Sequence, residues 1–428
     1  MFQTLKNAWK IKDLQNKLLF TLLIIILYRL GAQIPVPYIN SAVIEGLGQQ
    51  FSGSILGYMD IMAGGALSQA TLFALSVSPY ITASIIIQLL SVAIPYFEKL
   101  SKDGEAGRKK INMWTRYVTI GLALLTSFGY MKLLDSYGYL VEGANWFAKL
   151  VIVASYCAGA SLVMWLAEKI NESGIGNGIS MILFANIISS GPTLVASLWR
   201  IITSSSYPLV VGILLGIVIL AIVLAIVVLV VLVTNSERKI PIQYAKRMVG
   251  RRMYGGQSSI IPLKVVSVGV LPLIFAYSFM AFPGTIIQLA SKPTSGLYQW
   301  WMNNMSATSP LYMIVCALLI IAFTYFYSSI SFQPDEMAKN IQQQGGAIPS
   351  VRPGKPTADY LKRINNRLIL FAALFLAVLA TLPNIITEAA KVNIPFAASS
   401  LLIAVSVALE TKRQLDDMLV ARNYDTLS

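Results

Sequence analysis

The chain lacks the side chains on which most enzyme chemistry depends. It contains no histidine, the most common general base and metal ligand in proteins. Its two cysteines, Cys157 and Cys316, each lie inside an apolar run, so neither a disulfide framework nor a metal site is expected. An intramembrane protease would need a serine with a histidine, or paired aspartates within apolar segments, and the sequence has neither pattern. We therefore predict a protein that is not an enzyme and that binds no cofactor.

A glycine-rich stretch, GIGNGIS at residues 174–180, invites comparison with a phosphate-binding loop. A phosphate loop follows a strand and carries a lysine after its glycines, and both features are missing here. A turn that begins a helix explains the stretch better, with Asn177 or Ser180 near the helix N-cap. The stretch therefore predicts local structure and not nucleotide chemistry.

The elements that surround these residues are long and apolar. Hydrophobic residues make up 56% of the chain and charged residues 12%, and many apolar runs approach the ~20 residues that cross a bilayer. No small-residue cleavage pattern follows the first run, so we interpret it as a span and not as a signal peptide. The sequence predicts an all-α polytopic membrane protein with ten transmembrane helices. These spans cover about residues 18–34, 72–95, 115–134, 147–167, 179–199, 208–233, 263–290, 311–332, 367–387 and 396–410.

The basic residues predict how the spans are oriented. If the N-terminus is cytoplasmic, all but six of the 33 Lys and Arg residues lie in the two tails or near the inner ends of the spans. Lys and Arg concentrate on the cytoplasmic side of membrane proteins, so we expect both termini in the cytoplasm. The predicted domains are a cytoplasmic tail, an N-terminal half, a C-terminal half and a second cytoplasmic tail. Their bounds are 1–17, 18–199, 200–410 and 411–428.

Two predicted cytoplasmic loops, at about 234–262 and 333–366, are long and basic. One interpretation is that these loops do no more than fix the orientation of the spans. Their length favours a further role, because ERKIPIQYAKRMVGRRMYGG at 237–256 mixes basic residues with Ile, Tyr and Met, as a docking surface for a large partner does.

Several long stretches, in the same order along the chain, closely resemble the SecY/Sec61-alpha family of protein-conducting channel subunits. They are GGALSQATLFALSVSPYITASIIIQLL (64–90), GEAGRKKINMWTRY (104–117), WLAEKINESGIGNGISMILF (165–184), ERKIPIQYAKRMVGRRMYGGQSSIIPLKV (237–265), FQPDEMAKNIQQQGGAIPSVRPGKPTADYL (332–361) and SLLIAV (400–405). The resemblance implies two inverted pseudo-symmetric halves, spans one to five and six to ten, closed around an hourglass pore; five spans per half fit such an inversion.

The function that this resemblance implies is that of the central pore-forming subunit of a channel in the bacterial plasma membrane. Such a channel passes unfolded secretory polypeptides across the membrane and releases transmembrane segments sideways into lipid. A partner motor ATPase or the ribosome supplies the energy.

The resemblance places a ring of bulky apolar side chains where the two halves meet. The matching positions are Val77, Ile81, Leu183, Ile274 and Ile403. Branched aliphatic side chains exclude water from a narrow constriction and form no hydrogen bonds with a moving chain, so any polypeptide sequence could slide through.

The resemblance also implies a lateral gate between spans two and seven, through which apolar segments leave for lipid. The residues expected at this gate are Thr82, Ser84, Gln88, Ser278 and Phe282. Pro79 lies within predicted span two, where it removes one backbone hydrogen bond and favours a kink. Where the family usually reads KVNxAGVIP, this chain reads KVVSVGVLP, so Val266 takes the place of a gate asparagine.

Docking of the motor ATPase SecA or of the ribosome is implied at the tips of the two basic loops. The matching residues are Lys246, Arg247, Arg251, Arg252, Arg352 and Lys355. Pro353 and Gly354 should hold Arg352 in a turn. The other partners implied are SecE-type and SecG-type small membrane subunits, the preprotein with its signal peptide, and membrane lipids.

The stretch DIMAGGALSQATLF, residues 60–73, is too short to span, too apolar for a free loop and too rich in glycine for a firm helix. The resemblance explains it as a plug, a short re-entrant helix at about 58–71 that rests in the outer funnel; irregular backbone at that depth must line a cavity. The expected plug residues are Ile61, Met62, Ala63, Gly64, Gly65, Ala66, Leu67 and Ser68.

Two other classes of protein would share the composition. A secondary transporter with inverted repeats and broken helices is one, although it would be expected to carry ionisable residues at mid-span, where Arg29 is the main exception here. A lipid-facing scaffold or insertase subunit without a pore is the other, and it would not require a plug.

Overall fold

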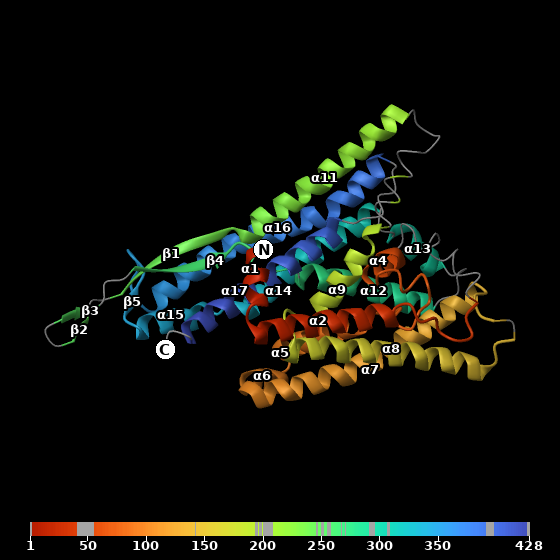
Figure 1. Ribbon diagram of the computed structural model, residues 1–428, viewed down its shortest axis with the longest axis horizontal. Helices are drawn as coiled ribbons and strands as arrows, with labels where there is room; N and C mark the ends of the chain where they lie inside the picture. The colour runs from red at the N-terminus through yellow and green to blue at the C-terminus, as the bar shows by residue number, and fades with distance from the viewer. Residues whose placement is uncertain are drawn as a thin grey trace.

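The computed structural model describes most of the 428 residues. The described ranges are 2–40, 55–141, 143–192, 196, 199, 209–244, 247–249, 252–254, 258–266, 268–269, 271–290, 296–305, 309–390 and 398–425. Within them the chain is mostly helical, and the helices of the N-terminal and C-terminal parts lie side by side (Figure 1).

The helices of the N-terminal part follow the apolar runs of the sequence. They are α1 (Phe2–Trp9), α2 (Lys12–Gly31), α4 (Ile55–Met62), α5 (Ser78–Ala93), α6 (Pro95–Lys102), α7 (Gly104–Ser136), α8 (Trp146–Ser173) and α9 (Gly178–Ser189). The helix α7 packs against α5 and α8, and α8 packs in turn against α2 and α9. The short α6 turns away from α5 by 104° at Pro95, because a helix usually ends before a proline.

The C-terminal part contains α11 (Leu209–Asn235), α12 (Leu271–Ala290), α13 (Gly296–Asn304), α14 (Pro310–Ser331), α15 (Pro334–Gln343), α16 (Lys355–Ala390) and α17 (Ala398–Asp425). Here α14 packs between α12 and α16, and α11 packs against α17. The two parts meet where α12 contacts α5 and α7 and where α17 contacts α9.

A small β-structure combines four strands between α11 and α12 with one strand between α15 and α16. The strands β1 (Glu237–Tyr244), β4 (Ser258–Lys264) and β5 (Gly346–Ala347) form an antiparallel sheet in the order β4-β1-β5, and β2 (Arg247–Val249) pairs with β3 (Arg252–Tyr254). Ile240 and Ile242 alternate toward a satellite core that includes Leu361 of α16. The sequence had predicted a basic loop here without strands, and the alternation of Ile with polar residues over 238–243 is the period-two signal that identifies β1.

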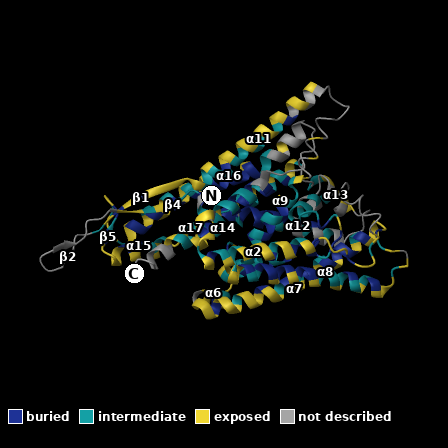
Figure 2. Cartoon of the chain, in the orientation of Figure 1, coloured by how far each residue is buried: buried dark blue, intermediate teal, exposed yellow. Residues whose placement is uncertain are grey.

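The buried residues form one large cluster in which both parts of the chain take part. Figure 2 shows this cluster in the middle of the molecule and exposed residues along the outer helices. On α11, Leu214 and Ile217 are more than half exposed although they are strongly apolar. Such a surface is suited to lipid or to another membrane helix.

The prediction of a polytopic helical membrane protein is confirmed, and each of the ten predicted spans coincides with a helix. Among the described residues, six helices are long and apolar enough to cross a membrane by themselves, or seven if the bent pair α5–α6 counts as one span. The others, such as α9 and the apolar start of α12, are shorter in the described part of the chain.

Two span boundaries differ from the prediction. Span two begins at Ser78 and not at residue 72, so that Pro79 lies in the first turn of α5. The predicted kink at Pro79 is therefore wrong, because a proline in the first helical turn removes no helical hydrogen bond. Span seven begins at Leu271, since the first residues assigned to it belong to β4 and a turn.

The cap predicted for α9 is correct, since the Asn177 side chain accepts a hydrogen bond from the Ile179 N–H at 3.1 Å.

Candidate functional site

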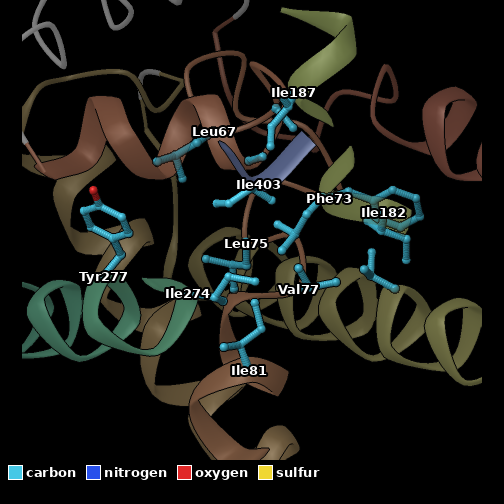
Figure 3. Packing of buried hydrophobic residues seen from close by; sticks show 14 of the residues in the cluster. Leu67, Phe73, Leu75, Val77, Ile81, Ile182, Ile187, Ile274, Tyr277 and Ile403 are labelled. Atoms are coloured by element: carbon cyan, nitrogen blue, oxygen red, sulfur yellow. The ribbon is translucent and has the colours of Figure 1, made fainter. Parts of the chain in front are cut away.

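The five residues expected to form the pore ring are all buried in the same cluster. They are Val77, Ile81, Leu183, Ile274 and Ile403, and none is more than 4% exposed. They come from both parts of the chain: Val77 and Ile81 from the start of α5, Leu183 from α9, Ile274 from α12 and Ile403 from α17. Figure 3 shows Val77, Ile81 and Ile274 close to Leu75. Both parts of the chain thus contribute to one buried cluster, and we call these five residues the aliphatic seal.

The segment before α5 closes against this seal. Helix α4 ends at Met62, and residues 63–77 then run as turns to the start of α5. Leu67, Phe73 and Leu75 from these turns enter the buried cluster (Figure 3). The sequence had placed Gly64 and Gly65 in the middle of a weak helix. They instead terminate α4, since their φ angles of 68° and 83° lie in the left-handed region that glycine adopts without strain.

The turns at 66–72 are held by the backbone of the preceding loop and by two tyrosines. The Tyr156 hydroxyl on α8 donates to the Ala70 carbonyl oxygen at 3.3 Å, and the Tyr130 hydroxyl on α7 donates to the Leu67 carbonyl oxygen. The Leu72 N–H donates to the Ile34 carbonyl oxygen at 2.8 Å. These bonds satisfy polar backbone groups that the apolar cluster would otherwise leave unpaired.

A buried polar network connects α4 with α2 and α9. Its centre is Asn186 of α9, whose Nδ2 lies 2.7 Å from the Met62 carbonyl oxygen, 2.9 Å from the Tyr28 hydroxyl and 3.2 Å from Ser76 Oγ. The Asn186 Oδ1 accepts from Arg29 Nη1 at 3.5 Å. Because an amide group has only two N–H bonds, the simplest arrangement donates to Met62 and Tyr28 while the Tyr28 hydroxyl, 3.2 Å from Ser76 Oγ, donates to that serine.

Gly64 is fitted to this network. A Cβ atom on Gly64 would lie 2.6 Å from Arg29 Nη1 and 2.9 Å from Asn186 Oδ1. The positive φ angle and the close approach together exclude a larger residue without rearrangement. Sequence reasoning noticed Arg29 but missed Asn186, Tyr130 and Tyr156; the lone asparagine in the apolar run SMILFANIIS was the available signal.

The residues expected at the lateral gate lie on the two helices that meet between the parts. On α5, Thr82 Oγ1 donates to the Ser78 carbonyl oxygen at 3.0 Å and Gln88 Nε2 donates to Ser84 Oγ at 3.3 Å. The Gln88 Oε1 atom is buried without a partner in the described part of the chain. Ser278 lies half-buried on α12, and the Phe282 side chain lies outside the described residues. The polar groups of α5 described here therefore bond within their own helix.

Val266 lies in the turn between β4 and α12 and is 8% exposed. An isopropyl group forms no hydrogen bond, so the Val266 side chain contributes no polar contact here.

The expected docking residues are only partly described. Arg352 and Lys355 are exposed beside a turn in which Ser350 and Gly354 have positive φ angles, and Thr357 Oγ1 donates to the Arg352 carbonyl oxygen at 2.9 Å. A cavity of about 480 Å³ lies next to Lys355 between α14, α15 and α16. Lys246 and Arg251, and the side chains of Arg247 and Arg252 in β2 and β3, lie outside the described residues.

Two charged groups outside the spans have displaced pKa values. Burial lowers the pKa of Lys264 at the end of β4, and the nearby positive charge of Arg413 on α17 lowers it further. The pKa of Glu172 is lowered because Lys169 Nζ donates to its Oε2 at 2.6 Å. No group of three His, Cys, Asp or Glu side chains that could hold a metal ion occurs among the described residues.

Comparison with known proteins identifies the family. The family model SecY matches residues 71–412. The protein translocase subunits SecY of Corynebacterium glutamicum and Streptomyces griseus are 42% and 43% identical to the chain, the first over 98% of both chains and the second over 99% of both.

Solved structures agree in fold. A structure of a protein-conducting channel aligns with a TM-score of 0.65 at 22% identity, over 94% of this chain and 91% of that one. A second SecY structure, whose plug domain is described as stabilising the closed state of the translocation channel and maintaining a membrane seal, aligns with the same score and coverage at 20% identity. Sec61 in a canine ribosome–channel complex aligns with a TM-score of 0.63 at 19% identity, again over 94% and 91%. With a family model and relatives that cover nearly the whole chain, the protein belongs to the SecY family of protein translocase subunits.

Proposed function

We propose that the chain is the central pore-forming subunit of a protein-conducting channel in a bacterial plasma membrane. It passes unfolded secretory polypeptides across the membrane and releases transmembrane segments sideways into lipid. The observation that carries this proposal is the aliphatic seal, which draws Val77, Ile81, Leu183, Ile274 and Ile403 from both parts of a chain of this family.

The seal suits a channel that must remain tight and yet accept any sequence. Aliphatic side chains repel water from the constriction and form no hydrogen bonds with the backbone that passes through. Helix α4 and the turns that follow it are the plug of this closed state. They lie against the seal and are held there by hydrogen bonds from α7, α8 and α9.

The seam between α5 and α12 is the lateral gate. These helices belong to different parts of the chain and are in contact, so separating the two parts would open a path from the seal to lipid. The bonds of Thr82 and Gln88 within α5 do not resist this separation, because they do not cross the seam.

We infer that partners supply the energy, as the resemblance to the SecY/Sec61-alpha family implies. The β1–β4 ribbon and the turn with Arg352 and Lys355 receive the motor ATPase SecA or the ribosome, and positive charge there favours an acidic or phosphate-rich partner. SecE-type and SecG-type subunits cover apolar helix faces. Both termini lie in the cytoplasm.

The test is to stall a secretory precursor halfway across and to crosslink it from the channel. A photo-reactive residue at Thr82 or Ser278 should capture the precursor, whereas one at Leu125, which is 41% exposed on the outer face of α7, should not. Capture at Leu125 with equal yield, or no capture at Thr82 and Ser278, contradicts the channel. The latter result is expected of a transporter or of a scaffold without a pore.

A further inference from the structure

The proposed plug, α4 and the turns that follow it, consists of two portions that differ in burial and in hydrogen bonding. Ala66, Leu67, Ala70 and Phe73 are all at most 5% exposed, while the described side chains of α4 from Met59 onward are only half-buried. The turns at residues 66–73 also form hydrogen bonds with the Tyr130 and Tyr156 hydroxyls and with the backbone near residue 34. The turns are therefore packed into the surrounding buried cluster, which we call the wall, and α4 lies against that wall.

The joint between the two portions is Gly64–Gly65. Both residues are in the left-handed region, and the Asp60 carbonyl oxygen accepts the Gly65 N–H at 2.9 Å. The Asp60 side chain also reaches across the joint, since its Oδ1 accepts a hydrogen bond from the Ser68 N–H at 2.7 Å. Glycine permits large changes of φ and ψ here at little steric cost.

Beyond the joint, α4 contacts α9 and α12, and Asn186 of α9 forms a hydrogen bond with its last residue. The Asn186 Nδ2 donates to the carbonyl oxygen of Met62, the last residue of α4, and the Asn186 side chain is completely buried. The carbonyl groups at the end of a helix have no partner within the helix, so this bond satisfies a group that would otherwise be unpaired in an apolar region. The bond is lost if α4 moves and is restored if α4 returns.

We propose that Asn186 is the latch of the plug, and that the plug opens by swinging α4 alone about Gly64–Gly65 while residues 66–77 stay in the wall. This inference rests on the proposed function of the segment as the closing element of a channel. It divides the plug predicted from the sequence, since Ala66, Leu67 and Ser68 belong to the fixed portion.

The test measures the two portions separately in membranes that contain the full-length chain. Cys157 and Cys316 are replaced by alanine, and a single cysteine is introduced by Met59→Cys on α4 or by Leu67→Cys in the wall. The reaction rate with a water-soluble maleimide is then measured with and without Asn186→Leu. At Met59→Cys we expect an increase of about tenfold, the effect of losing one buried hydrogen bond. At Leu67→Cys we expect no change.

The matched control is Asn365→Leu. Asn365 is also a buried asparagine, 7% exposed, and donates to Ser328 Oγ at 3.3 Å, but it joins α16 to α14 away from the plug. It should leave both rates unchanged. If Asn186→Leu does not accumulate in the membrane, Gly64→Ala replaces it, because the added methyl group collides with the Asn186 and Arg29 side chains and should raise the Met59→Cys rate too.

An unchanged rate at Met59→Cys overturns the latch, and an equal increase at both cysteines overturns the hinge. Neither readout requires transport. A chain that shows the expected labelling but never captures a stalled precursor would overturn the proposed function and leave the latch in place.

Discussion

At the scale of residues, the proposed seal depends on side chains that have no polar group. Val77, Ile81, Leu183, Ile274 and Ile403 carry no polar group, and their positions at helix starts and crossings bring them together from four helices and from the residue that precedes α5. A single hydroxyl in this cluster would bring water into the constriction and leave a polar group near apolar neighbours.

We therefore expect Ile81→Ser and Ile274→Ser to make the resting channel leak. The measurement is the release of a small dye from proteoliposomes, and the double variant should release it several-fold faster than the parent. Leu125→Ser and Leu318→Ser are matched controls, since both leucines lie on outward faces, 41% and 61% exposed. Equal leakage from the controls would indicate general loosening, and no leakage from the double variant would remove these residues from the seal.

Residue types could be predicted better than residue partners. The resemblance selected five aliphatic positions that the structure buries in one cluster. It did not select Asn186 or Tyr130, because a polar residue in an apolar run can pack against any neighbouring helix, and only the folded backbone shows which carbonyl group it reaches.

At the scale of elements, the β1–β4 ribbon consists of a supporting base and a tip. Pairing of β1 with β4 extends from Glu237 and Lys264 to Gln243 and Ser258, and the base is held by apolar contacts with α16. Four of the basic residues expected to dock a partner, Lys246, Arg247, Arg251 and Arg252, lie beyond this paired base in the sequence.

Replacing residues 245–257 by an Asn-Gly pair should therefore leave the fold intact. With Tyr244, the pair forms a three-residue connection between Gln243 and Ser258, a length that joins antiparallel strands well. We expect normal amounts of the variant in the membrane and an unchanged melting temperature, with loss of most motor-driven translocation. If the melting temperature and translocation both fall, the tip instead supports the fold.

The start of each element was harder to predict than its existence. Each of the ten predicted spans overlaps a helix, yet hydropathy extended span two across turns that are as apolar as the helix itself. The left-handed conformation of Ser76 and the position of Pro79 in the first turn define the true start, and neither follows from hydropathy.

At the scale of the whole molecule, the charges and the arrangement agree. The β-strands, α15 and α6 lie on one side of the molecule in Figure 1, and α4 and α13 lie on the other. The first group contains the basic loops, so this side is the one that the distribution of Lys and Arg assigns to the cytoplasm.

The orientation can be tested with single cysteines in a background without Cys157 and Cys316. Lys6→Cys and Val420→Cys should react with an impermeant maleimide only after the cells are opened. Trp146→Cys, 77% exposed at the opposite end of the molecule, should react in intact cells. Reaction of either terminal cysteine from outside would reverse the proposed topology.

The bend between α5 and α6 has a consequence for how the protein is made. A helix of 16 residues rises by only about 24 Å, less than the roughly 30 Å of a hydrocarbon core, and α6 then leaves at 104°. Such a helix is a poor substrate for stepwise insertion during synthesis. We expect α5 to enter the bilayer only when α7, its long and well-packed neighbour, has been synthesised, so that these two helices insert as a pair.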